Sequence, residues 1–345
     1  MSARVTVIIV SWNARDLLQK CLPSVCATDW DNLEIVLADN GSTDGSAEWV
    51  EATFPQVRVI RHGSNLGFCA GNNRAIEQTS GDYVVLLNND VEVPTDWLRP
   101  MVAEMEGDAR IAAVQPKLLQ FDDRTRFEYA GAAGGHLDRF GYPFARGRLF
   151  FDVERDLGQY DEAADVFWAT GAAMMLRRSA LAEVDLLDEQ FEFHMEEIDL
   201  CWRLWSAGFR VRCVPASRAW HIGGGSLAQG NPRKTLYNFR NSLLMLYKNL
   251  PRGQWISVFP ARVGLDAIAA LRFVLGFEFA NAWAVVRAYA QAHGMKGAYR
   301  QPEGGAPPSY GRSIVWDYFV RRRRTFSRLA REAFRISSGP AQETP

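Results

Sequence analysis

The segment Gly81–Val93, with the sequence GDYVVLLNNDVEV, joins a hydrophobic run to a polar end. Its apolar residues, Tyr83–Leu87, predict a strand that is buried on both faces. Asn88, Asn89 and Asp90 follow at the carboxyl end of this strand, which is where ligands bind in open α/β sheets. Carboxylate and amide oxygens there suit Mg²⁺ or Mn²⁺ carrying a phosphate. The alternative interpretation is a strand followed by an Asn/Asp turn.

Three more hydrophobic runs precede this strand and alternate with helical patterns. The predicted strands are Arg4–Val10, Leu33–Ala38 and Val57–Ile60. Helices are predicted after each of them, the first capped by Asn13, the second opened by Asp44 or Ser46, and the third spanning Ala70–Gln78. Four strand and helix alternations predict a mostly parallel sheet with helices on both faces.

The pattern is less regular beyond residue 94. A helix is predicted over Thr95–Glu106, and Phe121–Asp161 is expected to be a long irregular excursion with short strands. An apolar run follows over Asp165–Leu176, and its Thr170-Gly171 step predicts a bulge or a close backbone approach. A helix is predicted over Ile198–Ala207, with Gly208 ending it, and a strand is predicted over Val211–Val214. From Pro232 onward the pattern predicts amphipathic helices.

Composition and charge are those of an ordinary globular protein, at 48% hydrophobic and 23% charged residues. The net charge of -1 gives no indication of a nucleic-acid partner. Between Lys296 and Arg335, ten lysines and arginines stand against three acidic residues, a local charge of +7 that leaves -8 for the remainder. Such asymmetry suggests a basic segment with an anionic partner.

The five cysteines form no CxxC pair and are odd in number, so reduced thiols in a cytoplasmic protein are expected. No secretion signal is evident at the N-terminus. The most apolar C-terminal region, Trp255–Ala290, is interrupted by charged residues and leaves no uncharged run near the ~20 residues of a membrane span.

Glu196 and Glu197 open the predicted Ile198–Ala207 helix, and His221 lies downstream. Acidic residues at a helix N-terminus interact favourably with its dipole without any catalytic role. Two adjacent acids near a crevice also suit a general base. His221 by itself would be a surface or capping histidine, but the glycines after it leave room for a close approach to a metal.

Together, seven short motifs in one order resemble the inverting family-2 glycosyltransferases with the GT-A fold, in particular bacterial rhamnosyltransferase-like and galactofuranosyltransferase-like members. These motifs are VIIVSWN (7–13), ADNGSTDGS (38–46), NLGFCAGNN (65–73), LLNNDVEV (86–93), Thr170-Gly171-Ala172, MEEIDLC (195–201) and H-x-x-G-x-S (221–226). The resemblance covers about residues 4 to 250. It implies a GT-A nucleotide-binding domain followed by a C-terminal helical region.

The resemblance also implies roles for individual residues. The expected donor-binding residues are Trp12, Asp39, Asn65, Gly71, Asn73, Asn88 and Asn89. Asp90 and Asn88 match the last and first places of the DxD metal motif, and His221 matches a histidine that in some members completes the metal site. Glu197 matches the usual catalytic base and Glu196 the acid before it. The expected acceptor-binding residues are Trp168, Thr170 and Gly171.

Two departures from the family pattern stand out. Asn88 replaces the first aspartate of the metal motif, which weakens the case for tight metal binding. Glu197 replaces an aspartate and is longer by one methylene, so either Glu196 or Glu197 could be the base.

The predicted function is transfer of a sugar from a UDP-sugar or dTDP-rhamnose to a glycan or lipid-linked saccharide in cell-surface polysaccharide synthesis, assisted by Mg²⁺ or Mn²⁺. A sugar nucleotidyltransferase is an alternative, although Ser11-Trp12-Asn13 is not its Gly-rich loop. A non-catalytic nucleotide-sugar or glycan-binding protein is another, although neither Asp90 nor Glu197 has been lost.

The expected organisation is a catalytic domain over 1–230, with a nucleotide-sugar half (1–118) and an acceptor half (119–230), a helical region over 231–337 and a disordered tail over 338–345. The arginines of the helical region flank apolar side chains. This composition fits either helices on an anionic membrane surface, on the cytoplasmic face of the inner membrane, or an ordinary helical subdomain that packs on the catalytic unit or forms a homodimer.

Overall fold

A computed structural model describes residues 2–223 and 230–336 of the chain. These residues form a nine-stranded mixed sheet with the order β11-β13-β6-β12-β4-β1-β2-β3, and β5 pairs with β13. The strands are β1 (Val5–Ser11), β2 (Leu33–Asp39), β3 (Val57–Arg61), β4 (Tyr83–Asn88), β5 (Val91–Glu92), β6 (Ile111–Gln120), β11 (Ala164–Asp165), β12 (Ala173–Arg177) and β13 (Arg210–His221). Neighbours β4, β1, β2 and β3 run parallel, whereas β12 is antiparallel to both β4 and β6.

The run Tyr83–Leu87 forms β4 as predicted, and it is buried on both faces of the sheet. Val84 and Leu86 pack on one face, and Val85 and Leu87 pack on the other. Burying each of these side chains contributes about 1.5–3 kcal/mol, so the strand is fixed by its two cores. Its polar end, from Asn88 onward, is thereby held at the edge of the sheet.

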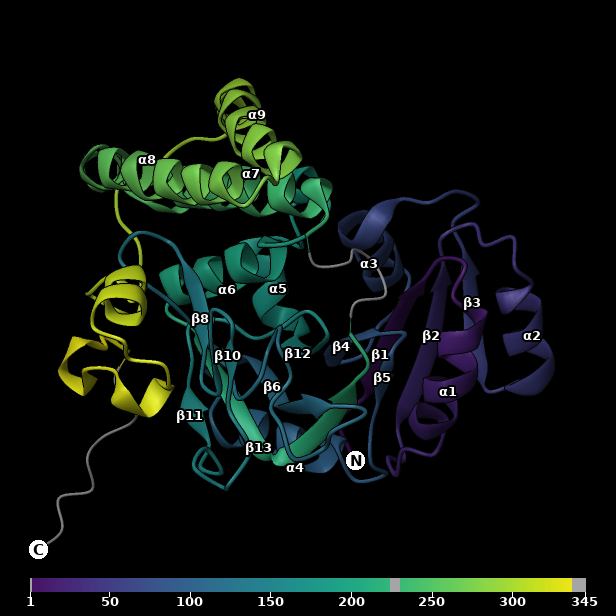
Figure 1. Cartoon of the computed structure of the whole chain (residues 1–345). Helices are drawn as coiled ribbons and strands as arrows, with labels where there is room; N and C mark the ends of the chain where they lie inside the picture. Colours follow the sequence, from purple (N-terminus) through teal and green to yellow (C-terminus); the bar gives the residue numbers. More distant parts are fainter. Residues whose placement is uncertain (1, 224–229, 337–345) are drawn as a thin grey trace, which may run out of the picture.

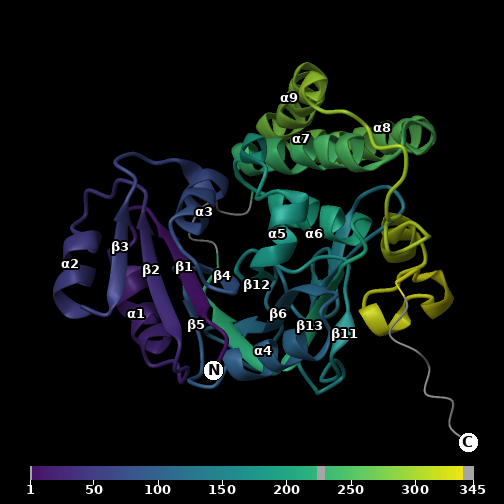
Figure 2. The same ribbon diagram turned by 180° about the vertical axis from the view of Figure 1, so that it is seen from behind.

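Helices cover both faces of the sheet (Figures 1 and 2). The helices of the catalytic part are α1 (Arg15–Cys26), α2 (Ser46–Thr53), α3 (Gly67–Glu77), α4 (Leu98–Gly107), α5 (Arg178–Val184) and α6 (Glu196–Ser206). α1 and α4 share one hydrophobic core with the sheet, and α3, α5 and α6 share the other. The alternation predicted from the sequence is therefore confirmed, with element ends shifted by a few residues.

The excursion after β6 contains a second, four-stranded antiparallel sheet. Its strands are β7 (Gly135–Leu137), β8 (Pro143–Ala145), β9 (Arg148–Leu149) and β10 (Asp152–Val153). Phe144 and Leu149 of this sheet pack against Tyr310, Ile314 and Tyr318 near the C-terminus. The short strands expected in this excursion are therefore present, and the end of the chain returns to cover them.

The C-terminal helices α7 (Pro232–Asn249), α8 (Arg252–Leu275) and α9 (Phe279–Met295) form a layer beyond α5 and α6 (Figure 1). The helical region predicted over 231–337 ends at Met295, and 296–336 contains only single turns of 3-10 or π-helix. In the described parts of the chain, no helix has the length and hydropathy to cross a bilayer. The predicted tail, 338–345, lies outside the described residues.

Three local predictions are corrected. Asn13 does not cap α1: it has φ 48° and its side chain accepts a hydrogen bond from Thr43 N at 2.7 Å. No strand was predicted for β6, where Pro116 disfavours a central position. The strand forms because its partner β13 shifts register beside Pro116, between Val214 and Arg218. β13 therefore extends to His221, well past the predicted end at Val214.

Candidate active site

The carboxyl ends of β1 and β2 hold an exposed tryptophan beside buried polar groups. Asn13 N donates to Ser42 Oγ at 3.0 Å, and Asn13 Oδ1 accepts from Thr43 N, so the loops after the two strands are joined. Trp12, between β1 and Asn13, is left 53% exposed. A large aromatic face held at a strand end can stack on a planar ligand.

Next to this tryptophan, Asp39 and Asn40 are buried at the end of β2. Asp39 accepts hydrogen bonds from Ser42 N at 3.2 and 3.3 Å. Asn40 Nδ2 donates to Gly67 O at 3.0 Å. A Cβ at Gly71 would lie 3.1 Å from both Asn40 Oδ1 and Val10 Cγ1, so the absence of a side chain there lets α3 approach the strand ends closely.

Asp90 lies in a buried chain of charged groups that also contains His221 and Glu128. His221 Nε2 donates to Asp90 Oδ1 at 3.1 Å, and His221 Nδ1 lies 3.3 Å from Glu128 Oε1. Glu128 also accepts hydrogen bonds from Ala130 N and Gly131 N at 2.6 and 2.9 Å. The β5–β13 pairing, with His221 opposite Val91, brings these three side chains together.

The negative charges of Asp90 and Glu128 and the positive charge of His221 stabilise one another. Burial lowers the pKa of His221, but its hydrogen bonds to Asp90 and Glu128 and the negative charges of these two groups outweigh this effect and raise the pKa to about 10. Burial opposes the ionisation of Glu128, but His221 and the two backbone N–H groups lower its pKa. His221 is therefore a cation held between two carboxylates, which orients Asp90.

Asn88 and Asp90 keep free oxygen atoms for a divalent cation. Asp90 Oδ2 and the Asn88 amide have no hydrogen bond to another described residue, and Asn89 Nδ2 donates to Ser11 Oγ at 3.1 Å. Hard oxygen donors of this kind fit Mg²⁺ or Mn²⁺. Within 2–223 and 230–336, no three His, Cys, Asp or Glu side chains are grouped so that they could hold a metal ion by themselves.

Glu196 and Glu197 begin α6, and each has one buried carboxylate oxygen without a hydrogen-bond partner among the described residues. Burial raises the pKa of Glu197 to about 7. Burial and the neighbouring Glu197 together raise the pKa of Glu196 well above its ordinary value. Glu197 is therefore partly ionised near neutral pH, which is the state required of a general base, and the charge of Glu197 makes Glu196 harder to ionise.

The loop before α6 is strained and is held in place by α7. Glu192, His194 and Met195 have φ values of 62°, 68° and 74°, which are unfavourable for residues with side chains. Asn241 Nδ2 donates to Phe191 O, Phe193 O and His194 O at 2.7, 2.7 and 2.9 Å. Asn241 thus fixes the loop that aims the acid pair.

Backbone contacts connect the Asp90 side of the site to the acid pair. Asn88 N donates to Ala172 O at 2.9 Å, which joins the end of β4 to the turn before β12. Gly171, which precedes Ala172, faces Glu197 and Phe68. A Cβ at Gly171 would lie 3.8 Å from Glu197 Cβ and 3.3 Å from the Phe68 ring. The strand ends and the acid pair therefore line one region.

Comparison with known proteins identifies the family of this chain. The model of the family described as glycosyl transferase family 2 matches residues 6–185, which is more than half of the chain. The chain belongs to glycosyl transferase family 2. The nucleotidyltransferase and non-catalytic alternatives are thereby set aside, and the chain is a glycosyltransferase.

This glycosyltransferase is 26% identical over 294 residues to an N-acetylglucosaminyl-diphospho-decaprenol L-rhamnosyltransferase of Mycobacterium tuberculosis, covering 77% of this chain and 90% of the relative. Its fold is similar to GalNAc-T7, solved with UDP, GalNAc and Mn²⁺, at TM-score 0.56 and 19% identity, covering 72% of this chain but only 48% of that one. A mannosyltransferase of Pyrobaculum calidifontis, solved with GDP-Man and Mn²⁺, has TM-score 0.52 and 17% identity, covering 86% and 76%. The GT-A-type fold is confirmed by these likenesses.

The glycosyltransferase brings most of the predicted site residues to the carboxyl edge of the sheet, but it places three of them elsewhere. Trp168 is buried in the core, where its Nε1 donates to His136 O at 2.9 Å. Thr170 is also buried, with its N–H on Gln115 Oε1 at 3.0 Å. Asn73 Nδ2 donates to Leu187 O at 2.8 Å and so ties α3 to the segment before α6. Each of these three residues thus has a partner within the fold, and an acceptor contact for Trp168 and Thr170 and a donor contact for Asn73 stay predictions.

The two ring nitrogens of His221 face Asp90 and Glu128, and its role as a metal ligand stays a prediction. The remainder of its motif, Gly224–Ser226, lies outside the described residues. Glu128 and Asn241 were missed because each lies in a stretch without a recognisable motif, far along the chain from its partners. The only available signal was their chemistry, an acid in an irregular segment and an amide within an amphipathic helix.

Proposed function

We propose that this glycosyltransferase transfers a sugar from a nucleoside-diphosphate sugar to a saccharide hydroxyl with inversion at the anomeric carbon. The observation on which the proposal depends is Glu197: it has a buried carboxylate oxygen without a partner and a pKa raised by burial to about 7. A carboxylate with these properties is suited to take a proton from an attacking hydroxyl.

The donor is assigned to the edge formed by β1, β2 and β4. The Trp12 ring is available to stack on the base, and Asp39 with Asn65 lines the nucleotide side. A divalent cation held by Asp90 Oδ2 and the Asn88 amide oxygen, which have no hydrogen bond to other described residues, would neutralise the charge that develops on the departing diphosphate. By this assignment the donor half is 1–118 and the acceptor half is 119–230.

The reaction is a single displacement. The acceptor oxygen forms a bond to the anomeric carbon from the face opposite the diphosphate, while the bond from that carbon to the diphosphate oxygen breaks. Glu197 takes the hydroxyl proton, and the nucleoside diphosphate leaves with the bonding electron pair. Opposite-face attack inverts the anomeric configuration, by the geometric argument that applies to inverting glycosidases.

Glu197 is assigned as the base rather than Glu196. Glu196 is the more buried of the two, and its pKa is raised by both burial and the charge of Glu197. Because both causes oppose its ionisation, Glu196 is less suited to act as the base than its neighbour Glu197.

The relative from Mycobacterium tuberculosis is named for transfer of L-rhamnose to N-acetylglucosaminyl-diphospho-decaprenol. By this likeness we assign dTDP-rhamnose, with UDP-sugars second, as donor and a lipid-linked saccharide as acceptor, in cell-surface polysaccharide synthesis. At 26% identity the likeness supports this class of donor and acceptor, and a panel of nucleotide-sugars distinguishes the donors within it.

The test is release of nucleoside diphosphate from a panel of UDP-, dTDP- and GDP-sugars in the presence of Mn²⁺ and a lipid-linked N-acetylglucosamine acceptor. One donor is expected to give acceptor-dependent release, which Asp90→Ala and Glu197→Gln strongly reduce. Full turnover by both variants with that donor would contradict the proposed mechanism. The thermal unfolding of each variant serves as the folding control.

A further inference from the structure

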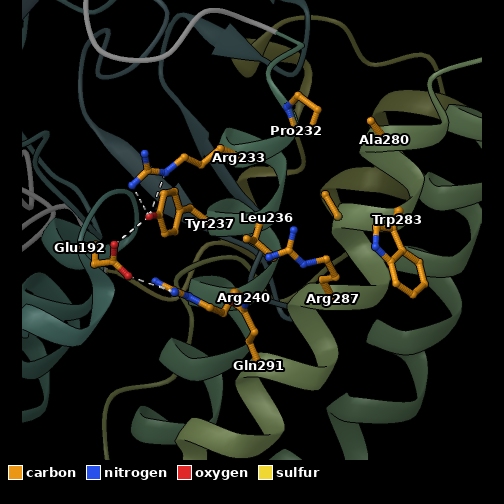
Figure 3. Close-up of a pocket in the computed structure, with 11 residues that line it drawn as sticks. Glu192, Pro232, Arg233, Leu236, Tyr237, Arg240, Ala280, Trp283, Arg287 and Gln291 are labelled. Carbon is orange, nitrogen blue, oxygen red and sulfur yellow. Dashed lines mark hydrogen bonds and ion pairs between the residues drawn. The ribbon is translucent and has the colours of Figure 1, made fainter.

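A cavity of about 540 Å³ lies between α7 and α9, away from the edge assigned to the donor (Figure 3). Its lining includes Arg233, Arg240, Arg287, Tyr237, Trp283 and Glu192. In Figure 3, Arg287 extends from α9 toward α7, whereas Arg233, Tyr237 and Arg240 extend from α7 toward the side of Glu192. The lining combines three arginines, two aromatic rings and one carboxylate with Pro232, Leu236, Ala280, Ala284 and Gln291, and no role in the donor chemistry above involves it.

The charges in the cavity favour an anion. Arg240 is buried and lies 3.2 Å from Glu192, which also accepts a hydrogen bond from the Tyr237 hydroxyl at 2.7 Å. Arg233 donates to the same hydroxyl at 3.0 and 3.1 Å. Arg240 also donates to Gln190 O and Asn241 Oδ1, whereas Arg287 has no hydrogen bond or ion pair with any residue in the described ranges. The lining therefore holds three guanidinium groups and one carboxylate, and Arg287 is the arginine left for a ligand. An arginine fork without a partner is suited to a phosphate.

The mouth of this cavity adjoins an unusual apolar surface. In α8 the buried side chains are Arg262 and Asp266, which pair at 2.9 Å, while apolar side chains face outward. The exposed apolar residues of α8, the following turn and α9 are Ile256, Val263, Ile268, Leu271, Val274, Leu275, Phe277, Phe279, Trp283 and Val286, here called the α8–α9 face. Trp283, 62% exposed, belongs to both this face and the cavity.

Helices with outward apolar and aromatic side chains beside arginines are typical of binding at a bilayer surface. Phe277 is 83% exposed at the turn between α8 and α9, Arg272 lies in the last turn of α8, and Arg287 lies midway along α9. An apolar face next to a cationic cavity fits a single amphiphilic molecule that has an anionic head and a long hydrocarbon chain.

The cavity is joined directly to the loop that aims the acid pair. Glu192 lines the cavity and belongs to the strained segment that ends at Glu196 and Glu197. Arg240 also donates to Phe191 O at 3.1 Å. A ligand head in the cavity would therefore lie on one side of this loop, with Glu197 on the other.

We propose that this cavity binds the diphosphate of a lipid-linked saccharide acceptor, with the α8–α9 face seated in the bilayer surface beside its hydrocarbon chain. The proposal rests on the proposed function for the identity of the acceptor. The saccharide attached to the diphosphate would then extend across the 192–195 loop toward Glu197. Arg287 supplies a guanidinium group that has no partner within the described residues. Trp283 lies where the diphosphate and the hydrocarbon chain of the lipid meet.

The test is co-sedimentation of the full chain with phosphatidylcholine vesicles, with and without a few per cent of a long-chain polyprenyl diphosphate, in the absence of any donor. The diphosphate lipid is expected to increase binding about tenfold, and Arg287→Ala is expected to remove that increase. Phe277→Ser should weaken binding to both kinds of vesicle. Arg331→Ala, which removes an exposed arginine from 296–336, is the matched control and should bind as wild type.

Three results would overturn the proposal. One is equal binding of Arg287→Ala and wild type to the diphosphate vesicles. Another is complete competition by inorganic diphosphate with no effect of the lipid chain, which would indicate a free-anion site. The third is concentration-dependent dimerisation that Phe277→Ser abolishes without vesicle binding, which would make the α8–α9 face an interface between two copies.

The binding assay does not depend on turnover, so the two proposals can fail separately. Diphosphate-dependent vesicle binding without release of nucleoside diphosphate from any donor would refute the proposed function and leave the cavity as an amphiphile site. Acceptor-dependent release that is unaffected by Arg287→Ala, together with unchanged vesicle binding, would refute the cavity proposal alone.

Discussion

Glu197 and Glu196 are neighbours, and substitution separates their roles. Glu197→Gln removes the carboxylate assigned as the base and should lower the rate of sugar transfer by about 10²–10⁴-fold. Glu196→Gln replaces a carboxyl group whose ionisation is opposed by burial and by the charge of Glu197, and we expect a much smaller loss. The measurement is the initial rate of nucleoside diphosphate release at saturating donor and acceptor.

Donor affinity provides the control for this pair, since neither side chain is assigned to the nucleotide. Both variants should therefore keep the thermal shift that the nucleoside diphosphate produces in wild type. A large rate loss in Glu196→Gln with near-normal turnover in Glu197→Gln would exchange the two assignments.

The raised pKa of Glu197 also predicts the acid limb of the pH profile. Because burial raises this pKa to about 7 and the base must be ionised, the transfer rate should fall about tenfold per pH unit below about 7. The rate should level off at higher pH. Measuring turnover across pH 5 to 9, with the stability of the protein checked at each pH, would reveal the limb, and a rate constant down to pH 5 would contradict the assignment.

The same shift has a defined effect on stability. The folded state holds the Glu197 proton to a higher pH than the unfolded chain, whose ordinary value is 4.5. This contribution to stability is therefore fully present below pH 4.5 and is lost as the pH rises through about 7. Glu197→Gln, which does not ionise, should remove this part of the pH dependence.

At the scale of elements, α7 holds the strained loop before α6. Asn241→Ala removes three hydrogen bonds to Phe191, Phe193 and His194 and should lower the free energy of unfolding by about 1–3 kcal/mol. It should also lower kcat more than it raises the KM for donor, because the acid pair loses its support. Denaturant unfolding and steady-state kinetics measure the two effects.

Asn238→Ala is the matched control, since Asn238 lies on the same helix and makes no hydrogen bond within the described residues. It should leave both quantities near their wild-type values. If Asn241→Ala were destabilised to the expected extent but kept full kcat, the hydrogen bonds of Asn241 would stabilise the loop without affecting catalysis.

The sequence predicted the elements whose pattern is local. β4, β1 and α6 follow from apolar runs and helical spacing, and their polar ends locate Asp90, Trp12 and Glu197. The extension of β13 to His221 could not be predicted in this way. It depends on pairing with β6 around Pro116, which involves residues about one hundred positions apart.

The same limit applies to individual side chains. Trp168 and Asn73 have residue types that suit ligand binding, but Trp168 packs on Gly135 and Asn73 binds the backbone at Leu187. Glu128 becomes part of the site only through His221. Residue type indicates what chemistry is possible, whereas tertiary packing decides which side chains remain available.

At the scale of the whole molecule, the C-terminal segment is part of the fold. Arg321 and Arg323 pair with buried Asp317 at 3.3 and 3.5 Å, and Arg324 lies 3.5 Å from Asp152. Much of the positive charge that suggested an anionic partner is therefore used within the chain.

Tyr310 anchors this segment on the small sheet, where its ring packs on Phe144 and its hydroxyl donates to Asp317 at 2.5 Å. Tyr310→Ala should lower the free energy of unfolding by about 3–5 kcal/mol, because it leaves a cavity in a fully buried site. Tyr310→Phe keeps the ring and should cost about 1–3 kcal/mol, because Asp317 Oδ2 loses the hydroxyl donor while Oδ1 keeps Arg321 and Arg323. Equal, small losses in denaturant unfolding would show that the segment does not stabilise the fold.

The most direct test of the central claim is the anomeric configuration of the product. With the donor found in the nucleotide-sugar panel and a lipid-linked N-acetylglucosamine acceptor, proton NMR of the product reports the configuration at the transferred sugar. Single displacement with Glu197 as base predicts the configuration opposite to that of the donor, together with loss of product formation in Glu197→Gln. A product that retains the donor configuration would contradict the account.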